Sequence, residues 1–225
     1  QPHTYEYLEI MERWLLEHGM PPITRVWYTT KDGERLTLEQ ECLRSGSLPS
    51  IAYGHKKCSL KHKVTPQEKF CNHHPGCRDA WAKGEKVVKL IGYDAGEERR
   101  RIKALPHDLQ DPKYRKEYPL MDWGWYRGDC IQAIQSAGLP LPGKSSCFFC
   151  PSMKPREIRT LYHQYPEMLE RALAIEDNAR PNLRTVRGLG RDFAWRDFIL
   201  ADEAQLTLPE AFSADDLPCS CSVSG

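Results

Sequence analysis

The segment of residues 86–93, KVVKLIGY, constrains the fold of this chain more than any other stretch. It is a near-continuous apolar run, which is typical of a strand buried on both faces of a parallel sheet. Residues 23–29 are β-rich and alternating, residues 118–122 form a short apolar segment, and both predict strands. Because helical patterns alternate with these segments through the first two-thirds of the chain, the sequence predicts an α/β fold with a parallel sheet.

Helical periodicity predicts most of the remaining elements. The expected helices cover residues 5–18, 37–43, 66–81 with a break at Pro75-Gly76, 97–103, 126–137, 155–165, 166–179 and 195–203. Only about three strands are visible, and the chain opens on a helix, so we expect the first strand of the sheet to lie upstream of residue 1. The predicted parts are an incomplete α/β core at 1–125, a helical cluster-binding part at 126–206 and a cysteine-containing tail at 207–225.

Composition excludes several classes of protein. Among 225 residues no run of 18 is apolar, and the polar start QPHTYEYLEI is unlike a signal peptide, so we expect no membrane partner. The net charge of +1 does not by itself predict a nucleic-acid partner. Nine cysteines without a secretion signal favour a reducing compartment, the cytoplasm, where cysteines serve metals, clusters or redox chemistry more often than disulfides.

The sharpest local motif is Cys147-Phe148-Phe149-Cys150. Two cysteines at this spacing can present both sulfurs to one metal, although a redox dithiol and a packed pair are alternatives. Cys58, in the cationic stretch GHKKCSLKHK, and Cys130 are candidates for the other two ligands. Four thiolates suffice for a [4Fe–4S] cluster or a Cys₄ zinc site, and their spacing does not choose between the metals.

A second set of possible ligands lies in the loop CNHHPGC. Cys71, His73, His74 and Cys77 match a low-specificity metal pattern, and the alternative is a helix break with incidental cysteines. Cys219 and Cys221 are too close together for relaxed chelation, and their role stays open. Cys42, on an amphipathic helix, is expected in the core.

Cationic and polar residues near these cysteines indicate an anion-binding region. Residues 94–97 (DAGE) follow the predicted strand of residues 86–93, and ligands of open α/β sheets bind at such strand ends. The alternative is that these residues only begin a solvent-exposed helix. The proposed anion-binding residues are Lys56, Lys61, Asp94, Glu97, Arg100 and Lys144. The common phosphate-binding glycine loops are absent from the sequence.

Four segments, taken in order, resemble the phosphoadenosine phosphosulfate (PAPS) reductase family, in particular its phage and bacterial branch, which is similar to DNA phosphorothioation sulfurtransferases. They are residues 47–63, 84–100, 118–158 and 188–195 (GLGRDFAW), and the long block 118–158 is the most specific. The resemblance runs over nearly the whole chain. It implies an adenine nucleotide alpha-hydrolase-like fold that binds an adenylated sulfate or an ATP-like ligand.

The resemblance also implies functional residues. Cys58, Cys130, Cys147 and Cys150 match the family's [4Fe–4S] ligands, and Asp94, Glu97 and Arg100 match residues that face the nucleotide. Members carry a Ser-Gly-Gly-type pyrophosphatase loop after the first strand, and this sequence does not contain it. We therefore expect a truncated chain, a partner chain that supplies the missing part, or a loss of catalysis, and we assign no catalytic residue.

Three functions follow as hypotheses. The first is an enzyme of reductive sulfur metabolism or sulfur transfer, an oxidoreductase or a transferase, with an iron–sulfur cluster. The second is a non-catalytic or partner-completed subunit with a structural Cys₄ metal site. The third is a zinc-stabilised nucleic-acid-binding module, which the small net charge and the irregular cysteine spacing disfavour.

Overall fold

The computed structural model describes residues 2–205, which divide into two compact units. The sheet unit contains residues 2–26 and 67–145, and the helical unit contains residues 27–66 and 146–205. Each unit combines segments from both halves of the chain. Within residues 2–205 no helix is long and apolar enough to span a membrane.

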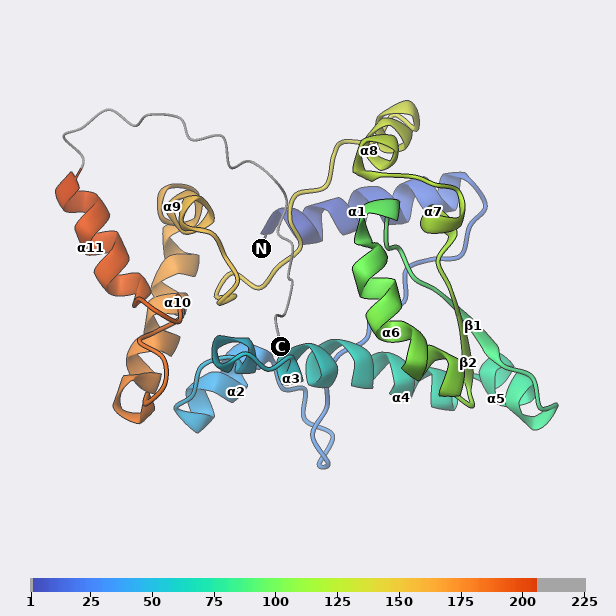
Figure 1. Ribbon diagram of the computed structural model, residues 1–225, viewed down its shortest axis with the longest axis horizontal. Coiled ribbons are helices and arrows are strands. Elements are labelled where there is room, and N and C mark those ends of the chain that lie inside the picture. The colour runs from blue at the N-terminus through green and yellow to red at the C-terminus, as the bar shows by residue number, and fades with distance from the viewer. Residues whose placement is uncertain (1, 206–225) are drawn as a thin grey trace. The chain divides into compact units, whose positions relative to one another are not determined.

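The sheet unit is a short parallel β-α-β motif surrounded by helices. Its elements are α1 (Pro2–Glu17), most of α4 (Thr65–His73), α5 (Pro75–Ala82), β1 (Val87–Leu90), a 3₁₀ turn (Ala95–Glu97), α6 (Glu98–Gln110), β2 (Tyr114–Glu117), α7 (Pro119–Asp122) and α8 (Arg127–Ser136). The strands pair in parallel, with Val87 opposite Tyr114 and Leu90 opposite Glu117. Figure 1 shows β1 and β2 side by side, with α6 connecting them.

Burial in the sheet unit is sparse. In β1 the side chains alternate between half-buried and exposed, and Leu90 is 68% exposed. Of the described hydrophobic residues in this unit, only Tyr114 and Tyr118 are buried. Parallel sheets are normally covered on both faces, so a two-stranded sheet with this exposure differs from the fully buried strand that the sequence predicted.

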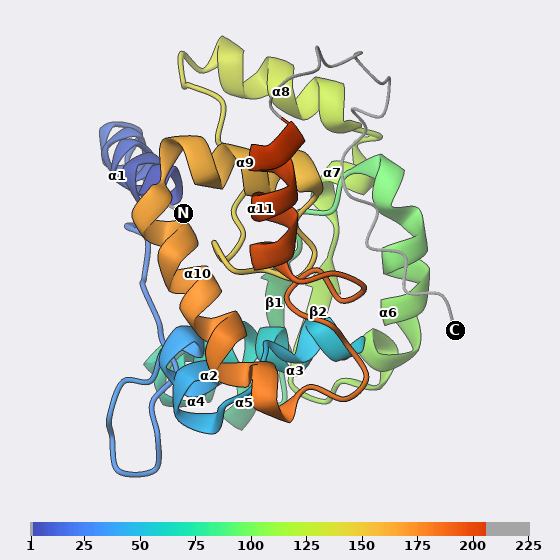
Figure 2. The same cartoon turned by 90° about the vertical axis from the view of Figure 1, so that its left-hand side faces the viewer.

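The helical unit holds the hydrophobic core. Its elements are α2 (Leu38–Ser45), a 3₁₀ turn (Ser50–Tyr53), α3 (Lys57–Ser59), a π-helical turn (Leu60–Val64), α9 (Pro155–Gln164), α10 (Pro166–Ala179), a 3₁₀ turn (Arg180–Asn182) and α11 (Trp195–Gln205). Helices α9, α10 and α11 pack against one another, and α10 also packs against α2 (Figure 2).

The core of the helical unit follows from helical periodicity. Helix α9 buries Ile158 and Leu161, which are three residues apart and face the same side. Trp195 at the start of α11 is fully buried in the same cluster. Each such side chain contributes about 2 kcal/mol of hydrophobic stabilisation relative to its exposure.

Most predicted helices are present, with ends set by local signals. Thr37 caps α2 and forms a capping box with Gln40. The predicted break at Pro75 is confirmed, because α4 ends at His73 and Pro75 is the first residue of α5. Pro155 and Pro166 likewise begin α9 and α10, where a missing N–H has no cost.

Two strand predictions were wrong. Residues 23–29 form no strand, and only an isolated antiparallel bridge joins Thr29 to Arg35 around the predicted turn at Gly33. Residues 118–122 form α7, and the second strand, β2, lies immediately before them. Pro119 lacks the N–H that a strand needs and suits the first turn of a helix, whereas the polar β2 residues pair because β1 lies alongside.

The predicted fold class is therefore present in its coarse form. The protein is mixed α/β and mostly helical, with one small parallel sheet of two strands in the described residues.

Candidate functional site

The motif Cys147–Cys150 forms a tight turn in the helical unit. The N–H of Cys150 donates to the carbonyl oxygen of Cys147 at 3.1 Å, and the N–H of Met153 donates to that of Cys150 at 2.9 Å. Phe148 and Phe149 are buried, with their ring centroids 4.8 Å apart. The two rings anchor the turn in the core, so both cysteines are held at its partly buried edge.

Cys58 and Cys42 lie within electrostatic range of this turn. Burial raises the pKa of Cys147, the neighbouring Cys150 raises it further, Lys63 opposes the shift, and Cys58 adds to it. Burial also raises the pKa of Cys42 to about 12, with smaller contributions from Glu41, Cys58 and Cys147. The helical unit thus contains three of the four predicted cluster ligands, with Cys58 in electrostatic range of Cys147, and a fourth thiol that the sequence assigned to the core.

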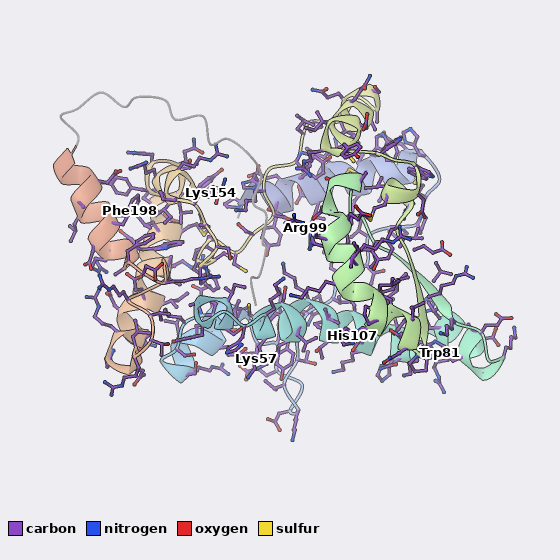
Figure 3. The ribbon with its side chains drawn as sticks, in the orientation of Figure 1. Lys57, Trp81, Arg99, His107, Lys154 and Phe198 are labelled. Atoms are coloured by element: carbon purple, nitrogen blue, oxygen red, sulfur yellow. The ribbon has the colours of Figure 1, made fainter. Side chains whose placement is uncertain are left out.

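A pocket of about 400 Å³ opens beside Cys58. It is bounded by α2, the 3₁₀ turn (Ser50–Tyr53) and α3, and its polar lining includes Glu41, Ser50, Lys57, Cys58 and Lys61. The N–H of Cys58 donates to the Ser50 hydroxyl at 2.8 Å, which fixes the start of α3. Lys57 is labelled on α3 in Figure 3.

The carboxylate of Glu41 is held from two directions. Lys61 Nζ lies 2.7 Å from one oxygen, and Nε2 of His62 lies 2.6 Å from the other. These consecutive residues belong to the π-helical turn, a feature that is frequent at functional sites. Burial raises the pKa of Glu41, but the hydrogen bonds from Lys61 and His62 outweigh it and bring the pKa below its usual value.

Lys61 therefore has defined partners within the helical unit. Besides its ion pair with Glu41, its ammonium lies 4.8 Å from the centroid of the Tyr28 ring. Lys56 immediately precedes α3 and is exposed, whereas Lys57 and Lys61 line the pocket.

The fourth predicted cluster ligand, Cys130, belongs to the sheet unit, on α8. Burial raises its pKa, and the nearby Asp94 raises it further while Arg127 opposes the shift. The structure thus places Cys130 beside the loop that follows β1.

The three predicted nucleotide-facing residues, Asp94, Glu97 and Arg100, occupy that loop. Asp94 accepts the N–H of Gly96 at 2.9 Å and forms a capping box with Glu97. Glu97 is ion-paired with Arg100, whose guanidinium lies 4.2 Å from the centroid of the Tyr93 ring. Lys144 is also in the sheet unit, and its carbonyl oxygen lies 3.1 Å from Nε2 of His3.

The second predicted metal loop is divided by the helix break. Cys71 lies in the last turn of α4 and Cys77 near the start of α5, and Cys71 lies near enough to raise the pKa of Cys77. Nδ1 of His73 lies 2.7 Å from the carbonyl oxygen of Lys69, and the His74 ring lies 5.4 Å from that of Phe70. The structure thus places the two cysteines on separate helices, and each imidazole has a neighbour of its own.

Among the side chains that the structure describes, those of residues 2–202, no group of three or more His, Cys, Asp or Glu is arranged to hold a metal ion. The described cysteines form no disulfide. Cys219 and Cys221 lie outside the described residues.

Three residues near the pocket, Glu41, Lys57 and Cys42, carry no sequence signal for a site. Glu41 and Cys42 looked like residues of an ordinary amphipathic helix, and Lys57 was one of several neighbouring lysines. The chain matches no known family model, no curated protein and no solved structure.

Proposed function

We propose that this chain is a PAPS reductase-like protein of reductive sulfur metabolism or sulfur transfer, which binds an adenylated substrate near an iron–sulfur cluster. The observation that carries the proposal is that Cys58 lies in electrostatic range of Cys147 within one unit and also lines a pocket together with Lys57 and Lys61. These segments also carry part of the sequence resemblance to that family.

The donor set fits such a cluster in its chemistry. Cys58, Cys147 and Cys150 are partly buried and supply soft sulfur ligands. Burial raises the pKa of the Cys147 thiol, and the nearby Lys63 opposes that shift. Cys130 is the fourth ligand of the proposal. When bound, a [4Fe–4S] cluster supplies a one-electron redox centre whose potential depends on burial and on hydrogen bonds to its sulfurs.

The lysines of the pocket suit an anionic substrate. Lys57 lines the pocket wall, and Lys61 adds a second ammonium that Glu41 holds in place. An ammonium group binds a phosphate or sulfate oxygen through charge-assisted hydrogen bonds. In the proposal these side chains bind and orient the charged end of an adenylated sulfate or an ATP-like ligand.

Anaerobic purification followed by iron and sulfide analysis tests the cluster. We expect about four iron atoms per chain and a brown protein in the wild type, as four thiolate ligands require. Cys147→Ala removes one sulfur and should abolish most of the bound iron and the visible absorbance. A colourless wild-type protein that contains stoichiometric zinc would support the four ligands but contradict the iron–sulfur cluster.

Two further variants identify the fourth ligand. Cys130→Ala should lose iron as Cys147→Ala does, whereas Cys42→Ala, the matched control, should retain it. Cys42 is the suitable control because it lies within electrostatic range of the same thiols but is almost fully buried. The reverse result, with iron lost only from Cys42→Ala, would contradict the assigned ligand set.

A partner-completed subunit is the second candidate function, and one observation favours it. The sheet unit has two strands and only two buried hydrophobic residues among those described, Tyr114 and Tyr118. Helix α6 exposes Ile102, Leu105 and Leu109, which share one face. Burial this sparse supplies little of the free energy that a stable domain needs, so this unit suits completion by further strands.

Calorimetric titration of the chain with adenosine phosphosulfate, ATP and single-stranded DNA separates the candidate functions. The enzyme proposal expects binding of an adenylated ligand that weakens in Lys57→Ala. Binding of neither nucleotide by the isolated chain, with the cluster intact, would favour the partner-completed subunit. Preferential binding of DNA would favour the nucleic-acid-binding module.

A further inference from the structure

The thiol pair at the α4–α5 break has no role in the proposed function. Cys71 and Cys77 lie on opposite sides of Pro75, on two helices that meet at His74. Both side chains are partly exposed, and Cys71 lies near enough to Cys77 to raise the pKa of its thiol. A small oxidant can therefore reach both sulfurs.

Both helices are tied to the start of β2. Lys113 Nζ donates to the Asn72 side-chain oxygen at 2.9 Å, which anchors the end of α4 next to Cys71. The indole Nε1 of Trp81 donates to the carbonyl oxygen of Lys113 at 2.9 Å, which anchors α5 (Figure 3). Lys113 thus connects the two helices that carry Cys71 and Cys77.

An aromatic contact between β2 and α5 lies next to the helix that carries Cys77. The Tyr114 ring is 4% exposed and packs edge-on against Trp81, with ring centroids 5.7 Å apart. The Tyr114 hydroxyl is buried and has no hydrogen-bond partner among the described residues. Burial raises the pKa of Tyr114, and the nearby Cys71 raises it further. Lys89 Nζ lies 3.4 Å from the centre of the same ring. This packing holds α5 against β2.

We propose that Cys71 and Cys77 form a reversible disulfide across the α4–α5 break, with a small-molecule disulfide such as oxidised glutathione as the oxidant. One thiolate attacks the oxidant and releases one small thiol, and the second protein sulfur then displaces the other. One S–S bond forms between the cysteines, both lose their protons, and the two electrons convert the small disulfide into two thiols. Neither His73 nor His74 takes part.

The surroundings favour slow and selective oxidation. Burial raises the pKa of Cys77, its neighbour Cys71 raises it further, and Lys89 opposes the shift. A small thiolate fraction slows exchange with an external disulfide, whereas the proximity of Cys71 speeds closure of the ring once a mixed disulfide exists. We therefore expect the intramolecular disulfide, rather than a stable mixed disulfide, as the product.

Trypsin digestion provides a direct test on the full chain. Cleavage after Lys69 and Arg78 yields the peptide of residues 70–78, FCNHHPGCR, in which Cys71 and Cys77 are the only cysteines. The folded protein is equilibrated anaerobically with mixtures of reduced and oxidised glutathione, alkylated and digested. We expect this peptide to become lighter by two hydrogen atoms and resistant to alkylation, along a single two-electron titration curve that reverses with reductant.

Matched measurements keep the test decisive. Cys71→Ser and Cys77→Ser should each remove the intramolecular product and leave the thermal melt nearly unchanged. The peptide of residues 36–44 contains the buried Cys42 as its one cysteine. Cys42 should react with the alkylating reagent only after the protein is unfolded, and the peptide should not lose two hydrogen atoms in mass. Glutathione adducts on the separate cysteines would overturn the proposal. Zinc-dependent protection that is lost in His73→Ala, or oxidation only after denaturation, would also overturn it.

Discussion

The carboxylate of Glu176, on α10, accepts the backbone N–H of Trp195, the first residue of α11, at 2.9 Å. The same side chain accepts the N–H of Leu189 at 2.7 Å and that of Arg196 at 3.0 Å. Glu176 is fully buried, and its charge lies at the positive end of the α11 dipole. This one residue therefore caps α11 and fixes the loop before it against α10.

Replacing Glu176 by Gln should destabilise the helical unit. The amide keeps one acceptor oxygen but turns an NH₂ group toward N–H donors, and it removes the charge that strengthens the three hydrogen bonds. We expect a loss of about 3 kcal/mol in the free energy of unfolding, measured by urea denaturation. Glu170→Gln, an exposed position on the same helix, is the control and should change stability by less than about 0.5 kcal/mol. Equal stability of the two variants would contradict the capping role.

Gly188→Ala should disturb the same contact from the other side. A Cβ at residue 188 would lie 2.4 Å from the Glu176 carboxylate oxygen and 2.6 Å from the Ala194 Cα, which belongs to the backbone and cannot rotate away. We expect a lower melting temperature and faster hydrogen exchange at the N–H groups of Leu189 and Trp195. A matched Gly128→Ala change, where nothing lies within 4 Å of the added Cβ, should leave both measurements unchanged.

The ion pair of Glu41 with Lys61 and its hydrogen bond with His62 should make stability depend on pH in the acidic range. Because the folded-state pKa lies below the unfolded value of about 4.3, the contribution is complete above that value and disappears as pH falls through the folded pKa. Glu41→Gln should therefore cost about 1 kcal/mol at pH 7, reduced by the partial exposure of the pair, and nearly nothing in strong acid. Denaturation curves of both proteins across this range provide the measurement. A difference that grows with acidity would have the wrong sign.

The exposed apolar residues of the sheet unit should promote binding of apolar dyes and self-association. Leu90 and Leu109 are 68% and 72% exposed. Leu90→Ser and Leu109→Ser should reduce both effects without lowering the melting temperature, because neither side chain is packed. Leu161→Ser, in the core of the helical unit, should instead lower stability by several kcal/mol. A large loss of stability in Leu90→Ser would show that this side chain is covered in the folded protein.

Local signals predicted the helices well because their causes lie within a few residues of each end. The side chain of Thr37 and the rings of Pro75 and Pro166 act on the backbone next to them. Strands need a partner that local patterns do not reveal. Residues 23–29 have β-rich composition and no ladder, whereas the polar segment Tyr114–Glu117 pairs because β1 lies beside it.

The candidate site divides in the same way. The sequence by itself determined the Cys147–Cys150 turn, the cationic surroundings of Cys58 and the break between Cys71 and Cys77, because each depends on neighbouring residues. Only the tertiary structure decided that Cys58 and Cys42 lie near the turn, and that Glu41 takes both Lys61 and His62 as partners. These relationships join α2, α3 and a distant turn through packing around one core, and packing between remote segments leaves no periodic pattern in the sequence.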